Sequence, residues 1–140
     1  MYLLDTDILL NLMSRAPSTS LVARLAMVAP DKQFTSSVSF GETVYGAYKQ
    51  ADATDNLLSD LEGKMIPNMG ILDFDTAAAR HYGILKEYLQ RVNLNVSDTD
   101  ARIAAIALNH GLTLLTGQTS RFQGIPGSRT EDWLAEKVSA

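Results

Sequence analysis

The stretch Met1-Tyr-Leu-Leu-Asp-Thr-Asp-Ile-Leu9 sets the pattern for the whole chain. Residues 2–4 form a short apolar run that is typical of a buried strand, and residues 6–13 continue with the composition of a helix. Asp5 stands at the junction, where a parallel strand would end. A carboxylate in this position either caps the helix that follows or faces a ligand at the edge of a sheet. This stretch alone leaves both interpretations open.

The same alternation of strand and helix continues to the end of the chain. Further short apolar runs predict strands at residues 33–35, 70–73, 112–116 and 129–131. Helices are predicted over residues 18–29, 37–50, 54–64, 76–92 and 98–109, with Pro30 ending the first of these and Gly111 the last. Short apolar strands separated by helices predict an α/β fold with a central parallel sheet of about five strands and helices on both faces. The chain has 140 residues and no linker or repeat, so we expect a single domain over residues 1–140.

Composition narrows the classes of protein that the chain can belong to. Its net charge of −4 gives no long-range attraction for nucleic acid, and with no Cys there is neither a disulfide framework nor a thiolate metal site. The first strand begins at residue 2, which leaves no room for a signal peptide, and no apolar run approaches membrane-spanning length. We therefore expect a cytoplasmic protein that does not use a membrane.

Two more acids interrupt apolar sequence at predicted helices. Glu42 lies in Ser39-Phe-Gly-Glu-Thr-Val-Tyr-Gly-Ala47, and Gly46, one turn on, suggests that something approaches this face closely. Asp100 begins Asp100-Ala-Arg-Ile-Ala-Ala-Ile-Ala-Leu108 and completes a capping box that starts at Ser97. At 100° per residue, however, Asp100 shares its face with apolar residues of the helix and points inward. Glu42 can also be interpreted as a solvated helix residue.

Three carboxylates brought together by folding would repel one another unless a cation shared them. Asp5, Glu42 and Asp100 are therefore candidates for a metal site that forms only when the chain folds. Carboxylate oxygens suit Mg²⁺ or Mn²⁺, whereas a chain without Cys and with two isolated His, His81 and His110, is a poor zinc ligand set. The two His are interpreted as a helix-face residue and a helix-end residue.

These stretches carry a family resemblance. Leu4-Asp-Thr-Asp-Ile8, Glu42-Thr-Val-Tyr-Gly-Ala47 and the helix beginning at Asp100 resemble, in order and spacing, the motifs of PIN-domain proteins of the VapC type. That group is the toxin half of many bacterial and archaeal toxin–antitoxin pairs. The likeness extends over residues 2–133 and includes the closing stretch Gly111-Leu-Thr-Leu-Leu-Thr116, Phe122, Ile125-Pro-Gly127 and Asp132-Trp133.

The resemblance implies a PIN-domain fold and a Mg²⁺- or Mn²⁺-dependent ribonuclease. It assigns the catalytic, metal-binding acids to Asp5, Glu42 and Asp100, and a polar supporting role to Thr116. It also implies an RNA substrate and a cognate antitoxin as partners. A bound ion would polarise the scissile phosphate and lower the pKa of a water molecule for in-line attack. Which RNA is cut is not specified by these motifs.

The chain departs from the pattern where the relatives often carry further polar and acidic residues. It has Gln118 where many have Asn, and Ser120-Arg121 where many have an acid before Phe122. Asp7 and Asp98 are the candidates to replace that acid, and the choice between one ion and two stays open. The basic residues placed to reach RNA phosphates are Arg15, Lys49, Arg102 and Arg121.

Other interpretations stay open at this point. A catalytically weak PIN fold would act as an antitoxin-binding module. Asp5-Thr-Asp-Ile-Leu9 also resembles the first motif of haloacid-dehalogenase-like phosphatases, although a clear later Asp-Asp pair is missing. Finally, we expect a homodimer formed through the helix at 76–92 or the helix at 18–29, because the former carries a cluster of apolar and aromatic residues, Tyr82, Leu85, Tyr88 and Leu89.

Overall fold

The computed structural model of the chain describes residues 1–49, 59, 63 and 69–135. The helix predicted over residues 54–64 lies outside the described residues, apart from 59 and 63, and stays a prediction. The last residues of the chain, 136–140, also lie outside them. None of the helices in the described part is long and apolar enough to cross a membrane.

A five-stranded sheet runs through the molecule with all of its neighbouring strands parallel. The strands are β1 (Tyr2–Leu4), β2 (Gln33–Ser36), β3 (Gly70–Leu72), β4 (Thr113–Leu115) and β5 (Thr130–Glu131), and their order across the sheet is β3-β2-β1-β4-β5. The predicted parallel sheet is confirmed. The chain moves outward from β1 through β2 to β3, and then returns to the other side of β1 for β4 and β5. The order therefore reverses between β1 and β4, and ligands of open parallel sheets bind at such a reversal, outside the carboxyl ends of the strands.

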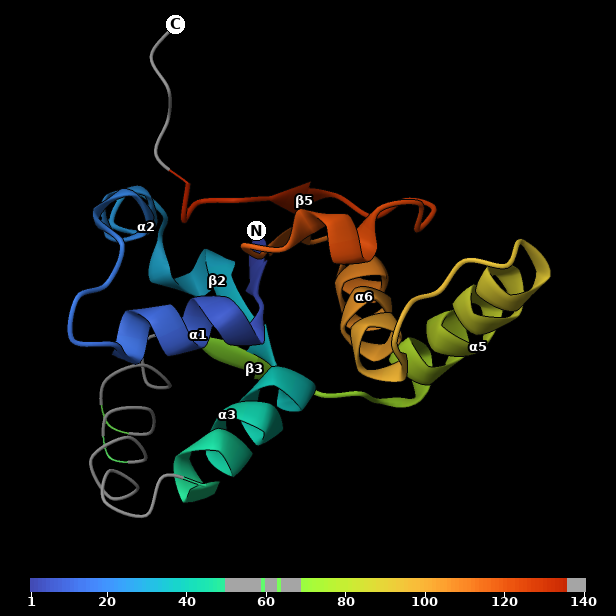
Figure 1. The fold of residues 1–140 in the computed structure, drawn as a ribbon, viewed down its shortest axis with the longest axis horizontal. Coiled ribbons are helices and arrows are strands. Elements are labelled where there is room, and N and C mark those ends of the chain that lie inside the picture. The colour runs from blue at the N-terminus through green and yellow to red at the C-terminus, as the bar shows by residue number, and fades with distance from the viewer. Residues whose placement is uncertain (50–58, 60–62, 64–68, 136–140) are drawn as a thin grey trace, which may run out of the picture.

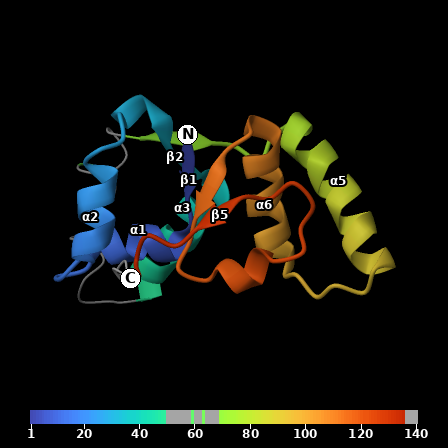
Figure 2. The same ribbon diagram turned by 90° about the horizontal axis from the view of Figure 1, so that it is seen from above.

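Helices cover both faces of the sheet (Figures 1 and 2). They are α1 (Thr6–Met13), α2 (Thr19–Leu25), α3 (Ser37–Lys49), α5 (Thr76–Arg91) and α6 (Asp98–His110). Successive residues of a strand point to opposite faces, and β1 shows the consequence. Leu3 packs into one core with residues of α5 and α6, whereas Leu4 packs into another with residues of α1, α2 and the buried Trp133.

One helix is shorter than its sequence predicts. The helix expected over residues 18–29 ends at Leu25, well before Pro30. The side-chain amide of Gln33 donates to the carbonyl oxygens of Leu25 and Val28, at 3.2 and 2.9 Å. Those carbonyls therefore find a partner from β2, and the chain turns early. At the end of α6 the prediction is correct, because Gly111 adopts the left-handed conformation (φ 64°) that closes a helix.

The turn-rich stretch after β4 contains a short element that was not predicted. Residues Thr119–Phe122 form a 3-10 helix, η4, with Phe122 buried in the core. This turn fixes the position of Arg121.

Candidate active site

Asp5 lies directly after β1, at the reversal of the strand order, and is only 1% exposed. Its Oδ1 accepts a hydrogen bond from the backbone N–H of Thr6 at 2.8 Å and so caps α1. Its Oδ2 is buried and has no hydrogen-bond partner. The two interpretations of Asp5 are therefore compatible, because one oxygen caps the helix and the other remains available.

Burial raises the pKa of the Asp5 carboxyl above its ordinary value, since a charge removed from water is costly. The Thr6 N–H opposes this rise, the nearby charge of Asp7 adds to it, and the hydroxyl of Thr116 and the guanidinium of Arg121 lower the pKa again. Thr116 is fully buried beside Asp5, but its geometry falls short of a hydrogen bond to Oδ2, which remains unpartnered. A cation placed at this oxygen would relieve the cost of its burial.

Asp7 is held by the backbone that follows β4. Its Oδ2 accepts a hydrogen bond from the N–H of Gly117 at 2.8 Å, and its Oδ1 is buried without a partner. A Cβ at residue 117 would lie 2.9 Å from that Oδ2 and 2.7 Å from Cδ1 of Leu134. Sequence reasoning missed the role of Gly117. The signal available in the sequence was a glycine directly after the predicted strand at residues 112–116.

Asp100 lies in the first turn of α6 and is 4% exposed. The hydroxyl of Ser97 accepts a hydrogen bond from the Asp100 N–H at 3.1 Å, as a cap should. The Asp100 carboxylate does not complete a capping box. It forms a two-pronged ion pair with Arg121, in which Nε donates to Oδ2 at 2.9 Å and Nη2 contacts Oδ1.

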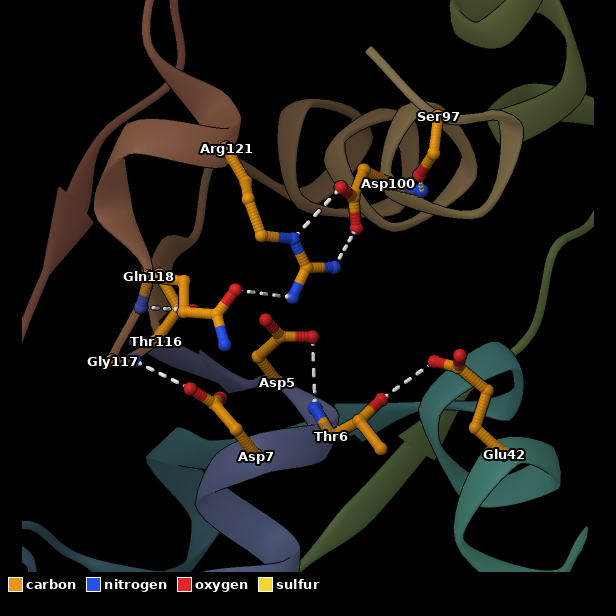
Figure 3. A network of polar contacts seen from close by, with 10 residues as sticks. All are labelled: Asp5, Thr6, Asp7, Glu42, Ser97, Asp100, Thr116, Gly117, Gln118 and Arg121. Atoms are coloured by element: carbon orange, nitrogen blue, oxygen red, sulfur yellow. Dashed lines mark hydrogen bonds and ion pairs between the residues drawn. The ribbon is translucent and has the colours of Figure 1, made fainter. Parts of the chain in front are cut away.

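Glu42 joins this region from α3. It is exposed, and its Oε1 accepts a hydrogen bond of 2.7 Å from the hydroxyl of Thr6, the residue after Asp5. In Figure 3 the Arg121 guanidinium lies between Asp100 and Asp5, while the Asp7 carboxylate points to Gly117 and that of Glu42 to Thr6. A side chain at Gly46 would meet nothing within 4 Å, so no part of the described chain accounts for the close approach that Gly46 suggests.

Oxygen ligands of this kind fit a hard divalent ion, although the described acids do not surround one common position. In the described residues, no group of three acidic or His side chains is close enough to hold an ion as it stands. Two buried carboxylate oxygens, Oδ2 of Asp5 and Oδ1 of Asp7, nevertheless have no partner. Buried carboxylates without a partner are costly, and hard oxygen ligands suit Mg²⁺ or Mn²⁺.

Several predicted residues lie elsewhere. Asp98, put forward as a replacement acid, is exposed and contacts Tyr82, Lys86 (3.5 Å) and Arg102 (2.9 Å), so it has no part in this cluster. Arg102 therefore lies with Asp98, outside the cluster of site acids. The other residues outside the cluster are exposed, namely Arg15, Lys49, His81 and His110. Among the four basic residues proposed as phosphate contacts, only Arg121 pairs with a site acid.

Comparisons with known proteins agree with this architecture. The PIN domain model matches residues 2–125. The tRNA(fMet)-specific endonuclease VapC of Shigella flexneri is 34% identical over 132 residues, which cover 94% of this chain and 97% of that protein. A corresponding endonuclease of Salmonella typhimurium is 39% identical over 98 residues, 70% of this chain and 73% of that protein.

Solved structures give the same result for the fold. DNA-bound VapBC from Salmonella typhimurium superposes with a TM-score of 0.86 at 32% identity, over 94% of this chain and 97% of that chain. VapBC2 from Rickettsia felis, bound to a DNA fragment from its promoter, also gives 0.86, at 27% identity, over 94% and 98%. The matched family is not that of the haloacid-dehalogenase-like phosphatases. The chain belongs to the PIN domain family and, within it, to the VapC type.

Proposed function

We propose that this chain is the endoribonuclease toxin of a toxin–antitoxin pair and that it hydrolyses RNA phosphodiester bonds with the help of Mg²⁺ or Mn²⁺. The observation that carries the proposal is the Asp5 carboxylate, buried at the reversal of the strand order with one oxygen unpartnered. The VapC relatives, named as ribonucleases and endonucleases, support the reaction type.

The residues that would hold the ion are Asp5, Glu42 and Asp100, with Asp7 beside Asp5 as a further oxygen donor. When bound, the ion supplies polarisation of the scissile phosphate and a water molecule of lowered pKa. The chain's own contribution is orientation. The hydroxyl of Thr6 holds Glu42, and the backbone of Gly117 holds Asp7. Positioning of this kind is a large part of the catalysis of phosphoryl chemistry.

Transfer RNA is the first substrate class to test. The relatives from Shigella flexneri and Salmonella typhimurium are named as tRNA(fMet)-specific endonucleases. With a net charge of −4, this chain must meet RNA phosphates with local positive charge rather than with its overall field. Within the described part of the chain, Arg121 pairs with Asp100 and is the candidate phosphate contact.

The proposal is tested by incubating the purified chain with transfer RNA, ribosomal RNA and messenger RNA while Mg²⁺ or Mn²⁺ is titrated. We expect defined cleavage products that appear with the ion and disappear when a chelator is added. Cleavage that is indifferent to the chelator would contradict the metal dependence, while leaving the ribonuclease assignment intact.

A second candidate function has one observation in its favour. The carboxylate of Asp100 is already neutralised by Arg121, which would suit a catalytically weak domain that binds an antitoxin. Both readings include an antitoxin partner, as the VapBC neighbours suggest. The absence of RNA cleavage at any Mn²⁺ concentration, together with tight antitoxin binding, would favour this second function.

A further inference from the structure

The ion pair of Arg121 and Asp100 has an unusual setting for a surface arginine. The side chain of Asp100 is only 5% exposed, and both of its oxygens contact the guanidinium. The hydrogen bond to Asp100 is the main reason why the pKa of Arg121 is raised. The negative charges of Asp5 and Asp7 raise this pKa further. One guanidinium is therefore the counter-ion of a cluster of carboxylates in the described part of the chain.

A divalent ion would need the same oxygens. Both acceptors of Asp100 are used by Arg121, and a cation bound between Asp5 and Asp100 would lie close to the guanidinium shown between them in Figure 3. The ion and the guanidinium would repel each other strongly, because partly buried surroundings screen charge less than water does. The ion and Arg121 cannot both have full use of Asp100.

We infer that Arg121 is an internal cation that competes with the divalent ion for Asp100. The inference rests on the proposed function, because it concerns the same acids. Binding of the ion moves the guanidinium off Asp100. Arg121 is thus a positioning residue that sets the affinity of the site for metal.

The surroundings of Arg121 allow this movement. Its side chain is 38% exposed, and it lies in η4 near the surface. Its hydrogen bond from Nη1 to Oε1 of Gln118 is long at 3.4 Å, and its guanidinium lies 5.7 Å from the centre of the Phe122 ring. A released guanidinium can therefore turn toward solvent while it stays tethered beside the acids. Its planar, two-pronged donors match a phosphate as well as they match a carboxylate.

Titration calorimetry of Mn²⁺ into the full-length chain tests the competition without any need for activity. We expect Mn²⁺ to bind about tenfold more tightly, or better, to Arg121→Ala than to the wild type, because a competing positive charge is gone. The matched control is Arg102→Ala, which removes the same charge near the same helix but from the pair with Asp98 outside the cluster. Its Mn²⁺ affinity should equal that of the wild type.

Equal or weaker Mn²⁺ binding by Arg121→Ala would overturn the competition and leave the metal site standing. Failure of every variant to bind Mn²⁺ would overturn the competition together with the proposed metal site.

Because Arg121→Ala could fail to fold, a second measurement uses the wild type itself. The Nε–H signal of Arg121 in isotope-labelled protein, assigned with Arg121→Lys, should be protected from solvent exchange without metal. It should lose that protection when Mg²⁺ is added, and unchanged protection at saturating Mg²⁺ would overturn the inference.

Discussion

At the scale of single residues, the two oxygens of Asp5 have different surroundings. One carboxylate oxygen caps α1, and the other is buried without a partner. The helix start therefore fixes the direction in which the second oxygen points. The burial of that oxygen without a partner is costly, and it is the reason why Asp5 is proposed as an ion ligand as well as a cap.

Asp5→Asn should separate stability from activity. The pKa of Asp5 is raised in the folded chain, so the folded state binds a proton at pH values where the unfolded state has lost it. The free energy of unfolding of the metal-free chain therefore falls as pH rises from about 3.8 through the folded pKa. Asn keeps a capping oxygen but carries no charge. We expect the variant to melt at or above the wild-type temperature at neutral pH, with this advantage vanishing below the ordinary Asp pKa.

In the same variant, RNA cleavage should fall by roughly 10³-fold, since an ion contributes several kcal/mol to transition-state stabilisation. Thermal melts from acid to neutral pH and a cleavage assay provide the two measurements. A variant that does not fold would show instead that Asp5 acts mainly through its cap.

Glu42→Gln tests a different kind of residue, because Glu42 is exposed and contributes little to the core. A glutamine oxygen can still accept the hydrogen bond from the Thr6 hydroxyl. We expect the free energy of unfolding to stay within about 0.5 kcal/mol of wild type, whereas Mn²⁺ affinity and cleavage both fall. Glu87→Gln is the control, since Glu87 is an exposed helical acid that pairs only with Arg91 among the described contacts. Equal cleavage by the two variants would remove Glu42 from the site.

At the scale of elements, Gly117 sets the distance between the end of β4 and the start of α1. A methyl group there would lie 2.9 Å from Oδ2 of Asp7 and 2.7 Å from Leu134. We expect Gly117→Ala to lower the free energy of unfolding by about 1–3 kcal/mol and to reduce cleavage, because Asp7 must move. Gly83→Ala in α5, where a Cβ meets nothing within 4 Å, should instead stabilise by about 0.5–1 kcal/mol. Denaturant melts of the two variants compare them directly, and similar behaviour of both would contradict the steric argument.

Helix starts were predictable from the sequence because their signals are local. Ser18, Asp75 and Ser97 each accept a hydrogen bond from a backbone N–H three residues further on, as N-cap residues do. Helix ends were harder to predict, since the early end of α2 depends on Gln33 in the following strand. The turn at η4 has no hydrophobic period and gave no signal of its own.

The acids of the candidate site could be named from their positions at element boundaries, but their contacts could not. Gly117 and Asp7 are 110 residues apart in the chain, and Arg121 and Asp100 are 21 apart. The first pair meets because β1 lies beside β4 in the sheet, and the second because η4, which follows β4, packs against α6. The basic residues were named without that arrangement, and of the four only Arg121 forms an ion pair with one of the site acids.

At the scale of the whole molecule, the expected homodimer depends on which apolar side chains of α5, the helix named for it, are exposed. Leu85 and Leu89 are buried against α6 and leave no excess apolar area. The outer face of α5 instead exposes Ile84 (68%) beside a pocket of about 510 Å³ that Leu85, Tyr88 and Pro126 help to line. The dimer stays a prediction, now assigned to this face.

Ile84→Lys should convert the dimer into a monomer, since a charge at the centre of an apolar interface is costly to bury. Ala79→Lys, an exposed position elsewhere on α5, is the control and should leave the dimer intact. Sedimentation of both variants at micromolar concentration gives the measurement. A monomeric wild type would refute the prediction outright.

The last prediction concerns the cell. If the chain is a toxin, its expression alone should slow growth, and Asp100→Ala should not, because the variant loses an oxygen donor of the candidate ion site. Asp98→Ala is a closely matched control: it is the same substitution two residues earlier on α6, but Asp98 contacts Tyr82, Lys86 and Arg102 rather than the acids of the site. Growth should therefore be slowed by Asp98→Ala as strongly as by the wild type.

Co-expression of the cognate antitoxin should restore growth. An acidic site is most readily blocked by a cation, so we expect the antitoxin to insert an Arg or Lys near Asp5, Glu42 and Asp100 and to exclude the ion. Replacing that basic residue by Ala should weaken inhibition of cleavage more than it weakens binding, because the rest of the antitoxin segment still contacts the surface. A wild-type chain that is harmless in the cell and inert toward RNA with Mn²⁺ present would overturn the nuclease assignment for this protein and leave an antitoxin-binding PIN domain in its place.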